Sequence, residues 1–302
     1  MASVVQKLTK RGLIKPPNFL PYNVQYEVLG GSISYGVSSE NKSDVDVVGF
    51  CIPPKELVFP HLAGEIPGFG TQIQRFENWQ QHHIKDQDAR KEYDITIYSI
   101  VRYVELCRQN NPNMIDSLFV PQDCVLFSTQ VGQLLRENRK LFLHKGCWHK
   151  FKGYAYSQVS QLTSRTYEKD SKRAQDVEKH GFSTKFGYHT LRLLSECQQI
   201  LETGDLDLRA NNEQLKACRR GEISAEEIRR IFSEQERVLE NLYSTSKLQH
   251  SPDENKIKNL LLNCLEIHYG SLSSAIVKPD ATVDALREIQ EIAQKALDNH
   301  IK

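Results

Sequence analysis

Residues 29–50, which read LGGSISYGVSSENKSDVDVVGF, constrain the fold of this chain more than any other stretch. The run before them, residues 22–29, alternates apolar and polar side chains in the pattern of a half-buried strand. The glycine pair at 30–31 then allows a turn with positive φ and lets a ligand approach the backbone closely. A short helix is expected over residues 32–38. The backbone N–H groups at its start, with a serine hydroxyl beside them, would form a cradle for a phosphate.

A second strand is expected over residues 44–52, and it carries two aspartates. The period of two in a strand places Asp44 and Asp46 on one face, while Val45 and Val47 point to the core. Two carboxylates on one face repel each other, so we expect a divalent cation between them. Mg²⁺ commonly binds one or two carboxylates plus the phosphates of a substrate. The pattern therefore predicts phosphoryl or nucleotidyl transfer, and the alternative is an acidic edge strand that binds nothing.

A third aspartate is predicted to lie near this pair. Residues 76–84 and 91–100 have the pattern of two antiparallel strands joined by a polar turn. Asp94 lies among apolar residues of the second strand, where a carboxylate costs free energy unless a charged group meets it. A metal ion shared with Asp44 and Asp46 would be that group. The alternative is an ordinary salt bridge.

Composition limits the class of protein. At 302 residues the chain can form two domains, and its formal net charge of +1 gives no overall preference for polyanions. The seven cysteines are dispersed and contain no CxxC pair, which predicts reduced thiols and no zinc site. The N-terminal residues lack the apolar core of a signal peptide, and no apolar run approaches the length of a membrane span. We therefore expect a soluble, cytoplasmic protein with no membrane segment.

The Gly-Gly-Ser turn followed by Asp-Val-Asp resembles the signature of the DNA polymerase beta nucleotidyltransferase superfamily. One branch is similar over a longer stretch, because Asp94 is followed by Tyr-Ser at 98–99, a helix, and Asn-Pro-Asn at 111–113 with Asp116 after it. This branch is the RNA repair pathway DNA polymerase beta family of bacteria and phages. The resemblance covers most of residues 22–280, and it implies that Asp94 completes a carboxylate triad. We interpret Asn113 and Asp116 as mainly structural groups that cap the next helix and fix the turn. A catalytic role is the alternative.

A cationic stripe is predicted on one later helix. Lys185, His189, Arg192 and Glu196 are spaced i, i+4, i+7 and i+11, which places them on one helical face. The first three resemble part of the second conserved block of the same family. Arginine binds phosphate oxygens bidentately and lysine binds them as a point charge, so these groups would bind the triphosphate and neutralise the leaving pyrophosphate. The alternative is a solvated face on which Arg192 pairs with Glu196.

The middle of the chain is locally basic. Residues 138–193 contain twelve Lys or Arg and four acidic residues, and Tyr154, Tyr156 and Tyr167 lie among them. Positive charge interleaved with stacking surfaces suits a nucleotide or an RNA end. A solvated helical face is the alternative.

From residue 128 onward the composition is typical of helices. We therefore expect a two-domain protein of the α/β (α+β) class. Residues 1–127 would form a small mixed-sheet nucleotidyltransferase domain of the polymerase beta type, with an N-terminal arm docked on it. Residues 128–302 would form an all-helical domain that closes over the nucleotide.

The resemblance implies an enzyme that transfers a nucleoside monophosphate from a nucleoside triphosphate to an acceptor hydroxyl and releases pyrophosphate. Gly31 and Ser32 would hold the β and γ phosphates. The groups that would bind two Mg²⁺ (or Mn²⁺) ions are Asp44, Asp46 and Asp94. The implied acceptor is an RNA 3′ end, such as that of a damaged tRNA. A small-molecule or protein hydroxyl is one alternative, and a protein that binds nucleotides without catalysis is the other.

Overall fold

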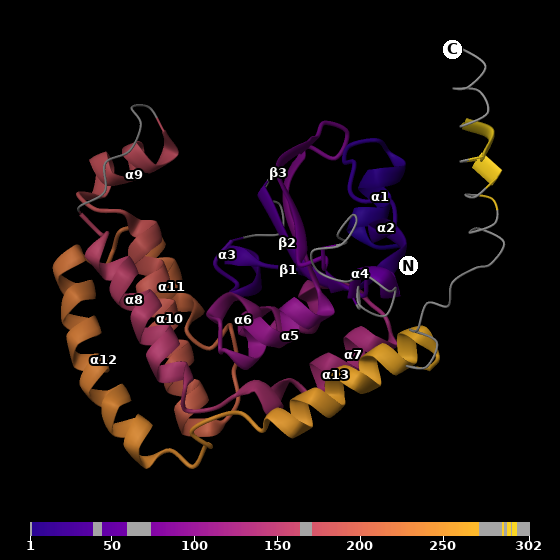
Figure 1. Cartoon of the computed structure of the whole chain (residues 1–302). Coiled ribbons are helices and arrows are strands. Elements are labelled where there is room, and N and C mark those ends of the chain that lie inside the picture. Colours follow the sequence, from indigo (N-terminus) through magenta and orange to yellow (C-terminus); the bar gives the residue numbers. More distant parts are fainter. Residues whose placement is uncertain are drawn as a thin grey trace.

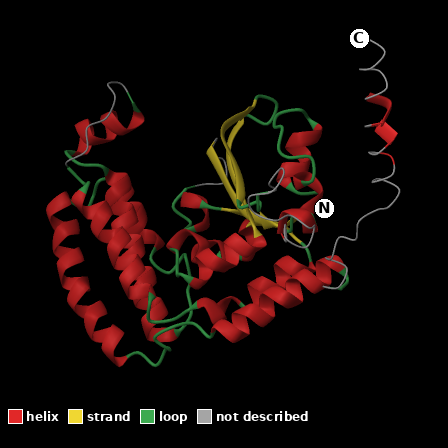
Figure 2. Cartoon of the chain, viewed as in Figure 1, coloured by secondary structure: helices red, strands yellow, loops and turns green. Residues whose placement is uncertain are grey.

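A mixed five-stranded sheet flanked by helices forms the first half of the chain, and a helical bundle lies beside it (Figures 1 and 2). The predicted fold class is confirmed: in the described part of the chain, only helices follow the last strand. The residues that the computed structural model describes are 2–38, 44–58, 74–163, 171–271, 286, 289–290 and 292–294.

The sheet has the strand order β3-β4-β2-β1-β5. Strands β2 and β4 are parallel, and the other neighbouring pairs are antiparallel. The sequence pattern predicted the first four strands to within a few residues and missed the last one. The bounds are β1 Val24–Leu29, β2 Asp44–Cys51, β3 Asn78–Asp86, β4 Lys91–Ser99 and β5 Val125–Ser128.

The N-terminal arm covers one face of this sheet. Helix α1 (Val4–Lys10) packs Val5 and Leu8 against Val45 and Val47, so the buried side of β2 faces the arm. The start of α1 is fixed by the buried carboxylate of Glu27, which accepts hydrogen bonds from two of its backbone N–H groups. The acidic face of β2 is therefore left on the opposite side of the sheet.

Helices on that opposite side connect the sheet to the bundle. Helix α5 packs on β2 and β4, and α6 packs on α5. Helix α13 returns from the far end of the chain to contact α5 and α7. Helix α10 is the centre of the bundle, because α8, α11 and α12 all pack on it. The bounds are α2 Leu20–Asn23, α3 Gly31–Ser34, α4 Lys55–Val58, α5 Ile100–Arg108, α6 Pro112–Phe119, α7 Gln130–Glu137, α8 Cys147–Ser160, α9 Lys172–His180, α10 Thr184–Thr203, α11 Asn212–Arg219, α12 Ala225–Thr245 and α13 Glu254–Tyr269.

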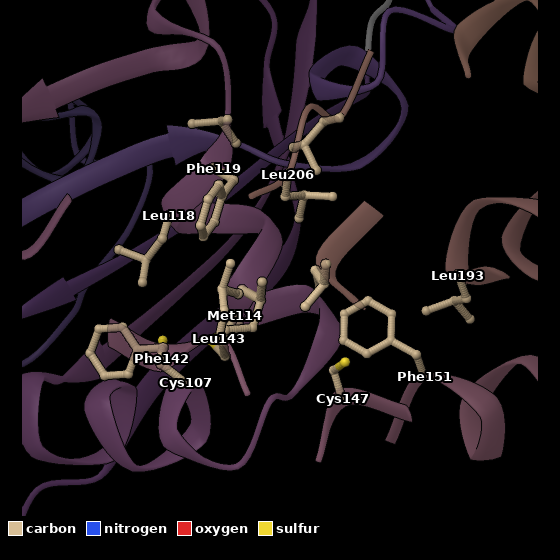
Figure 3. Packing of buried hydrophobic residues seen from close by; sticks show 14 of the residues in the cluster. Cys107, Met114, Leu118, Phe119, Phe142, Leu143, Cys147, Phe151, Leu193 and Leu206 are labelled. Atoms are coloured by element: carbon tan, nitrogen blue, oxygen red, sulfur yellow. The ribbon is translucent and has the colours of Figure 1, made fainter. Parts of the chain in front are cut away.

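One apolar core joins the two halves. Figure 3 shows Met114 and Leu118 of α6, Phe142 and Leu143 of the turn that follows α7, and Phe151 of α8 in the same cluster. The predicted boundary between residues 127 and 128 falls within β5, and it stays a prediction. Each of the seven cysteines is a buried thiol. None of the helices in the described part of the chain is long and apolar enough to cross a membrane.

Candidate active site

Four carboxylates lie in two rows on one face of the sheet, where β2 and β4 pair in parallel. Asp44 lies opposite Glu92, and Asp46 lies opposite Asp94. Neighbouring strands are about 4.8 Å apart, and paired side chains leave the sheet on the same side. The structure therefore brings the three predicted aspartates together. The sequence pattern missed Glu92, although it lies two positions before Asp94 and so shares its face.

The glycine turn packs directly against this acidic face. The Gly30 N–H donates a hydrogen bond of 2.8 Å to the Asp46 carbonyl oxygen. Gly31 has a φ of +63°, and a Cβ at this position would lie 2.2 Å from Asp46 Oδ2. Any other residue at this point would therefore collide with the carboxylate.

The helix after the turn is shorter than predicted. Instead of spanning residues 32–38, α3 ends at Ser34. The chain closes into a loop, because the N–H groups of Val37 and Ser38 both donate to the Ser32 carbonyl oxygen. The Ser38 hydroxyl also donates to the Ser32 hydroxyl over 2.6 Å. Ser32 is thus held within this loop by both its backbone and its side chain.

A cavity of about 580 Å³, called here the charged cavity, separates the acidic face from the helical half. Carboxylates form one wall and cations from α9, α10 and α11 form the other, so opposite charges face each other across it. Lys185 is the predicted cation that lies here, and its side chain is exposed. The charged residues that line this cavity are Asp44, Asp46, Glu92, Asp94, His83, Arg173, Asp176, Lys185 and Arg219.

Hydrogen bonds to Thr184 hold together the helices that form the cationic wall. Asp176 of α9 accepts hydrogen bonds from the Thr184 N–H and the Thr184 hydroxyl, each 2.8 Å long, and so caps the start of α10. Arg219 of α11 donates to the same hydroxyl over 2.9 Å. Sequence reasoning missed Arg173 and Arg219, because they lie in polar segments with no distinguishing pattern. Both arginines line the charged cavity because α9 and α11 pack at the start of α10.

A second cavity of about 310 Å³, called here the mixed cavity, also lies against the Asp46–Asp94 row. Asp46 and Asp94 line both cavities. The mixed cavity combines apolar side chains with amide, hydroxyl and imidazole groups. The residues from which these side chains come include Tyr35, Val48, His82, Thr96, Tyr98, Asn113, Met114, Asp116, His189 and Arg192.

Arg192 lies at the inner end of the mixed cavity and is only 6% exposed. Its Nη1 donates to Asp116 Oδ2 over 2.5 Å and to the Tyr35 hydroxyl, which itself donates to Asp116 Oδ2 over 2.6 Å. Its Nε lies 3.8 Å from Glu196 Oε1. Burial raises the pKa of both carboxyl groups, against the opposing effect of the guanidinium. The alternative pairing of Arg192 with Glu196 is present, but in a buried cluster instead of on a solvated face.

His189 lies between Lys185 and Arg192 on α10 and is half-buried at the mixed cavity. Burial, together with the nearby charges of Arg192 and Lys185, lowers the pKa of His189 well below its ordinary value. The imidazole is therefore uncharged at neutral pH. The predicted stripe thus passes from an exposed cation at the charged cavity to an uncharged imidazole and a buried, ion-paired guanidinium.

A β-bulge in β3 places two histidines beside Asp94, and the sequence pattern gave no reason to separate them from ordinary polar strand residues. His83 has a φ of +55°, and its N–H donates to Asp94 Oδ1 over 2.7 Å. Its Nδ1 lies 2.7 Å from Glu92 Oε1, and this contact raises the pKa of His83. His82 Nδ1 lies 3.6 Å from Asp94 Oδ1. The bulge therefore holds the Asp94 carboxylate in place.

Helix α6 is capped by a different residue from the two that were predicted. Pro112 occupies the first helical position, so Asn111 immediately precedes the helix. The Asn111 side chain accepts a hydrogen bond from the Met114 N–H and caps the helix. Asn113 is an exposed helical residue that lines the mixed cavity, and Asp116 is bound to Arg192 instead. The capping prediction for these two residues is wrong.

Residues 16–263 match the profile of the RNA repair pathway DNA polymerase beta family. The chain belongs to this family. Among solved structures, it is similar to a nucleotidyltransferase-like protein from Exiguobacterium sibiricum 255-15. That likeness has a TM-score of 0.28 and 9% identity, and it covers 80% of this chain and 75% of the other. No curated protein matches the sequence.

In this member of the RNA repair pathway DNA polymerase beta family, the acidic face fits a divalent cation. No group of three or more His, Cys, Asp or Glu side chains is preassembled as a metal cluster in the described ranges. Carboxylate oxygens are nevertheless the donors that Mg²⁺ and Mn²⁺ prefer, and Mg²⁺ takes its remaining ligands from water and substrate phosphates. The space at Gly31, which a Cβ would fill, keeps Asp46 Oδ2 accessible from the turn. The residues that would hold the ion are Asp44, Asp46 and Asp94.

Proposed function

We propose that this chain is a metal-dependent nucleotidyltransferase, which transfers a nucleoside monophosphate from a nucleoside triphosphate to a hydroxyl group of an RNA. The observation that supports this proposal best is the charged cavity, in which a wall of carboxylates faces Arg173, Lys185 and Arg219. A triphosphate with its cations needs both signs of charge at close range. The family supports nucleotidyltransferase chemistry in an RNA repair pathway.

In the proposed reaction an acceptor oxygen attacks the α-phosphorus and forms a new P–O bond. The bond from the α-phosphorus to the bridging oxygen breaks, and its electron pair leaves with pyrophosphate. Asp94, which the His83 N–H orients, accepts the proton of the acceptor hydroxyl. A divalent cation on the acidic face would neutralise phosphate charge and lower the pKa of that hydroxyl.

The residues around the triphosphate have separate roles in this proposal. Gly31 and Ser32 bring backbone N–H groups and a hydroxyl to the β and γ phosphates. Lys185 stabilises the leaving pyrophosphate as a point charge. The predicted roles of His189 and Arg192 are less direct, because the first is uncharged and the second is ion-paired. We propose that they close the inner side of the site next to the nucleotide.

An RNA acceptor is supported by the basic middle segment. Residues 138–193 carry eight more positive than negative charges. Tyr154 and Tyr156 are exposed on α8, where they could stack on bases, whereas Tyr167 lies outside the described residues. A small-molecule or protein hydroxyl remains the alternative acceptor.

The test is a transfer assay with each α-labelled nucleoside triphosphate, Mg²⁺ or Mn²⁺, and a mixture of tRNA, protein and small acceptors. We expect label on RNA and a loss of transfer when Asp44→Ala and Asp46→Ala are combined. Absence of label on every acceptor, or transfer that survives the double substitution, would overturn the proposal. Label on protein or on a small molecule would keep the chemistry and replace the acceptor.

A further inference from the structure

A third cavity, of about 340 Å³, lies inside the helical half of the molecule. Helices α10, α11 and α12 border it, and both α11 and α12 pack on α10 (Figure 1). We call it the amide cavity, because five of its eleven lining residues carry a side-chain amide. They are Gln198 and Gln199 of α10, Asn211 and Gln214 at the start of α11, and Gln235 of α12. None of the side chains assigned to the triphosphate or the metal ion lines this cavity, so it is separate from the proposed active site.

The lining of the amide cavity is polar but nearly uncharged. Among the described residues that line it, Glu202 alone carries a charge, and its exposed carboxylate accepts a hydrogen bond of 2.9 Å from Gln198. Apolar surface comes from Leu191, Leu194 and Ile231. A phosphate would find no cation in this lining and would lose its water. The cavity therefore fits a neutral ligand that has flat apolar faces and a polar edge.

Gln235 provides the observation that points to a ligand. Its Oε1 is buried and has no hydrogen-bond partner among the described residues. A buried acceptor without a partner costs free energy, which a donor on a ligand would recover. Gln199 and Gln214 use their Oε1 atoms to accept hydrogen bonds, of 2.9 Å from the Asp207 N–H and 2.7 Å from Asn211 Nδ2. Their amide nitrogens remain as donors, so the cavity offers both an acceptor and donors.

A nucleobase has the chemistry that this lining requires. A glutamine amide binds adenine through two hydrogen bonds, because its oxygen accepts from the N6 amino group and its nitrogen donates to N7. Adenine would thus supply the donor that Gln235 Oε1 lacks. A volume of about 340 Å³ is at the lower end for small-ligand sites, which suits a single base. We propose that the amide cavity binds an adenine base of the RNA acceptor. The RNA source of the base rests on the proposed function, whereas the adenine site itself does not.

Helix α11 links the amide cavity to the charged cavity. Asn211, immediately before α11, lines the amide cavity, and Arg219, the last residue of α11, lines the charged cavity. The 8 residues of this helix span about 12 Å at about 1.5 Å each. A stacked strand advances about 3.4 Å per nucleotide, so roughly four nucleotides cover this distance. An RNA whose end reaches the acidic face can therefore place a nearby base in the amide cavity while its phosphates stay outside.

The test measures the binding of short fluorescent oligoadenylate, oligouridylate and oligocytidylate by anisotropy, without nucleoside triphosphate or divalent cation. We expect the protein to bind oligoadenylate about tenfold more tightly than the other two. Gln235→Leu removes the amide at nearly the same size and should abolish this preference. Ala210→Trp fills the cavity from an exposed position in its lining and should do the same. The matched controls are Gln133→Leu, exposed on α7, and Ser233→Trp, exposed on α12 outside the cavity, and both should keep the preference.

Equal affinities for the three oligonucleotides would overturn the inference, and so would a preference that survives both Gln235→Leu and Ala210→Trp. Adenosine alone is the second arm of the test. If adenosine binds as tightly as oligoadenylate and both substitutions abolish its binding, the adenine site stands and its ligand is a free nucleoside instead of RNA. Transfer that needs Asp46, without any preference for oligoadenylate, keeps the proposed function and rejects only this inference. If no acceptor is labelled, the proposed function fails, and the anisotropy still decides whether the amide cavity binds adenine.

Discussion

Asp46 and Asp94 lie directly opposite each other in two parallel strands, and both the charged cavity and the mixed cavity are lined by this pair. The Asp46 side chain is bounded by the Gly31 turn, and the Asp94 side chain is bounded by the β3 bulge. Segments from four separate parts of the chain therefore converge where the α-phosphorus is proposed to react.

The space at Gly31 should be essential for activity beyond its effect on stability. Gly31→Ala introduces a Cβ 2.2 Å from Asp46 Oδ2 at a φ of +63°. We expect a loss of about 1–2 kcal/mol from the left-handed backbone and at least a tenfold loss of transfer, because the carboxylate is displaced. Gly12→Ala is the control, since Gly12 has a φ of +71° and nothing lies within 4 Å of its added Cβ. Both variants should lose similar stability in urea, and only the first should lose activity. Equal activities would contradict the account.

Removal of the Arg192 guanidinium should destabilise the fold in a pH-dependent way. Arg192→Met leaves Asp116 and Glu196 buried without their cation, which costs about 3–5 kcal/mol when the carboxyls are charged. Burial raises the pKa values of Asp116 and Glu196 in the folded state. Their contribution to the unfolding free energy is therefore most favourable at low pH, where both carboxyls are neutral, and it is lost as pH rises. The unfolding free energy of the variant should therefore increase as pH falls from neutral. Arg230→Met, which removes only surface ion pairs, is the control and should change little. A pH-independent loss would contradict the prediction.

Glu27 should make the docking of the N-terminal arm sensitive to pH. Burial raises its pKa from 4.5 to about 7, although hydrogen bonds from the Val4 and Val5 N–H groups oppose this change. Because the folded-state pKa is the higher one, the contribution of Glu27 is greatest below pH 4.5 and declines as pH rises to about 7. The change amounts to roughly 3 kcal/mol. Urea unfolding of the wild type and of Glu27→Gln from pH 4.5 to 8 should give diverging curves. Parallel curves would show that burial does not perturb Glu27.

Lys185 should act on the triphosphate and not on the fold. Its side chain is exposed at the charged cavity. Lys185→Gln should weaken binding of the Mn²⁺ complex of a nucleoside triphosphate by about tenfold or more, the scale of one charge-assisted hydrogen bond. The melting temperature should stay the same. Lys150→Gln, on the exposed face of α8, is the control for loss of one positive charge. Similar affinities for the two variants would assign the triphosphate to a different place.

The local features of the site were predictable from the sequence, whereas the burial of its individual side chains was not. Period two placed Asp44 and Asp46 on one face, and the apolar neighbours of Asp94 indicated that a charge must meet it. The parallel pairing of β2 with β4 depends on a crossover that no local pattern encodes. Helical spacing likewise put Lys185 and Arg192 on one face. It could not show that Lys185 lies at the charged cavity while Arg192 is buried. The partner of Arg192 in the buried cluster is Asp116, which lies 76 residues away in the sequence.

The position of the labelled phosphate tests the central claim most directly. The protein is incubated with RNA, Mn²⁺ and a nucleoside triphosphate labelled either at the α or at the γ phosphate, using the wild type, Asp46→Asn and Asp94→Asn. The account predicts that only the α label enters RNA, that pyrophosphate is released, and that each substitution lowers the rate by roughly a thousandfold, on the scale of losing a central electrostatic group. Transfer of the γ label, or a rate that survives both substitutions, would contradict it.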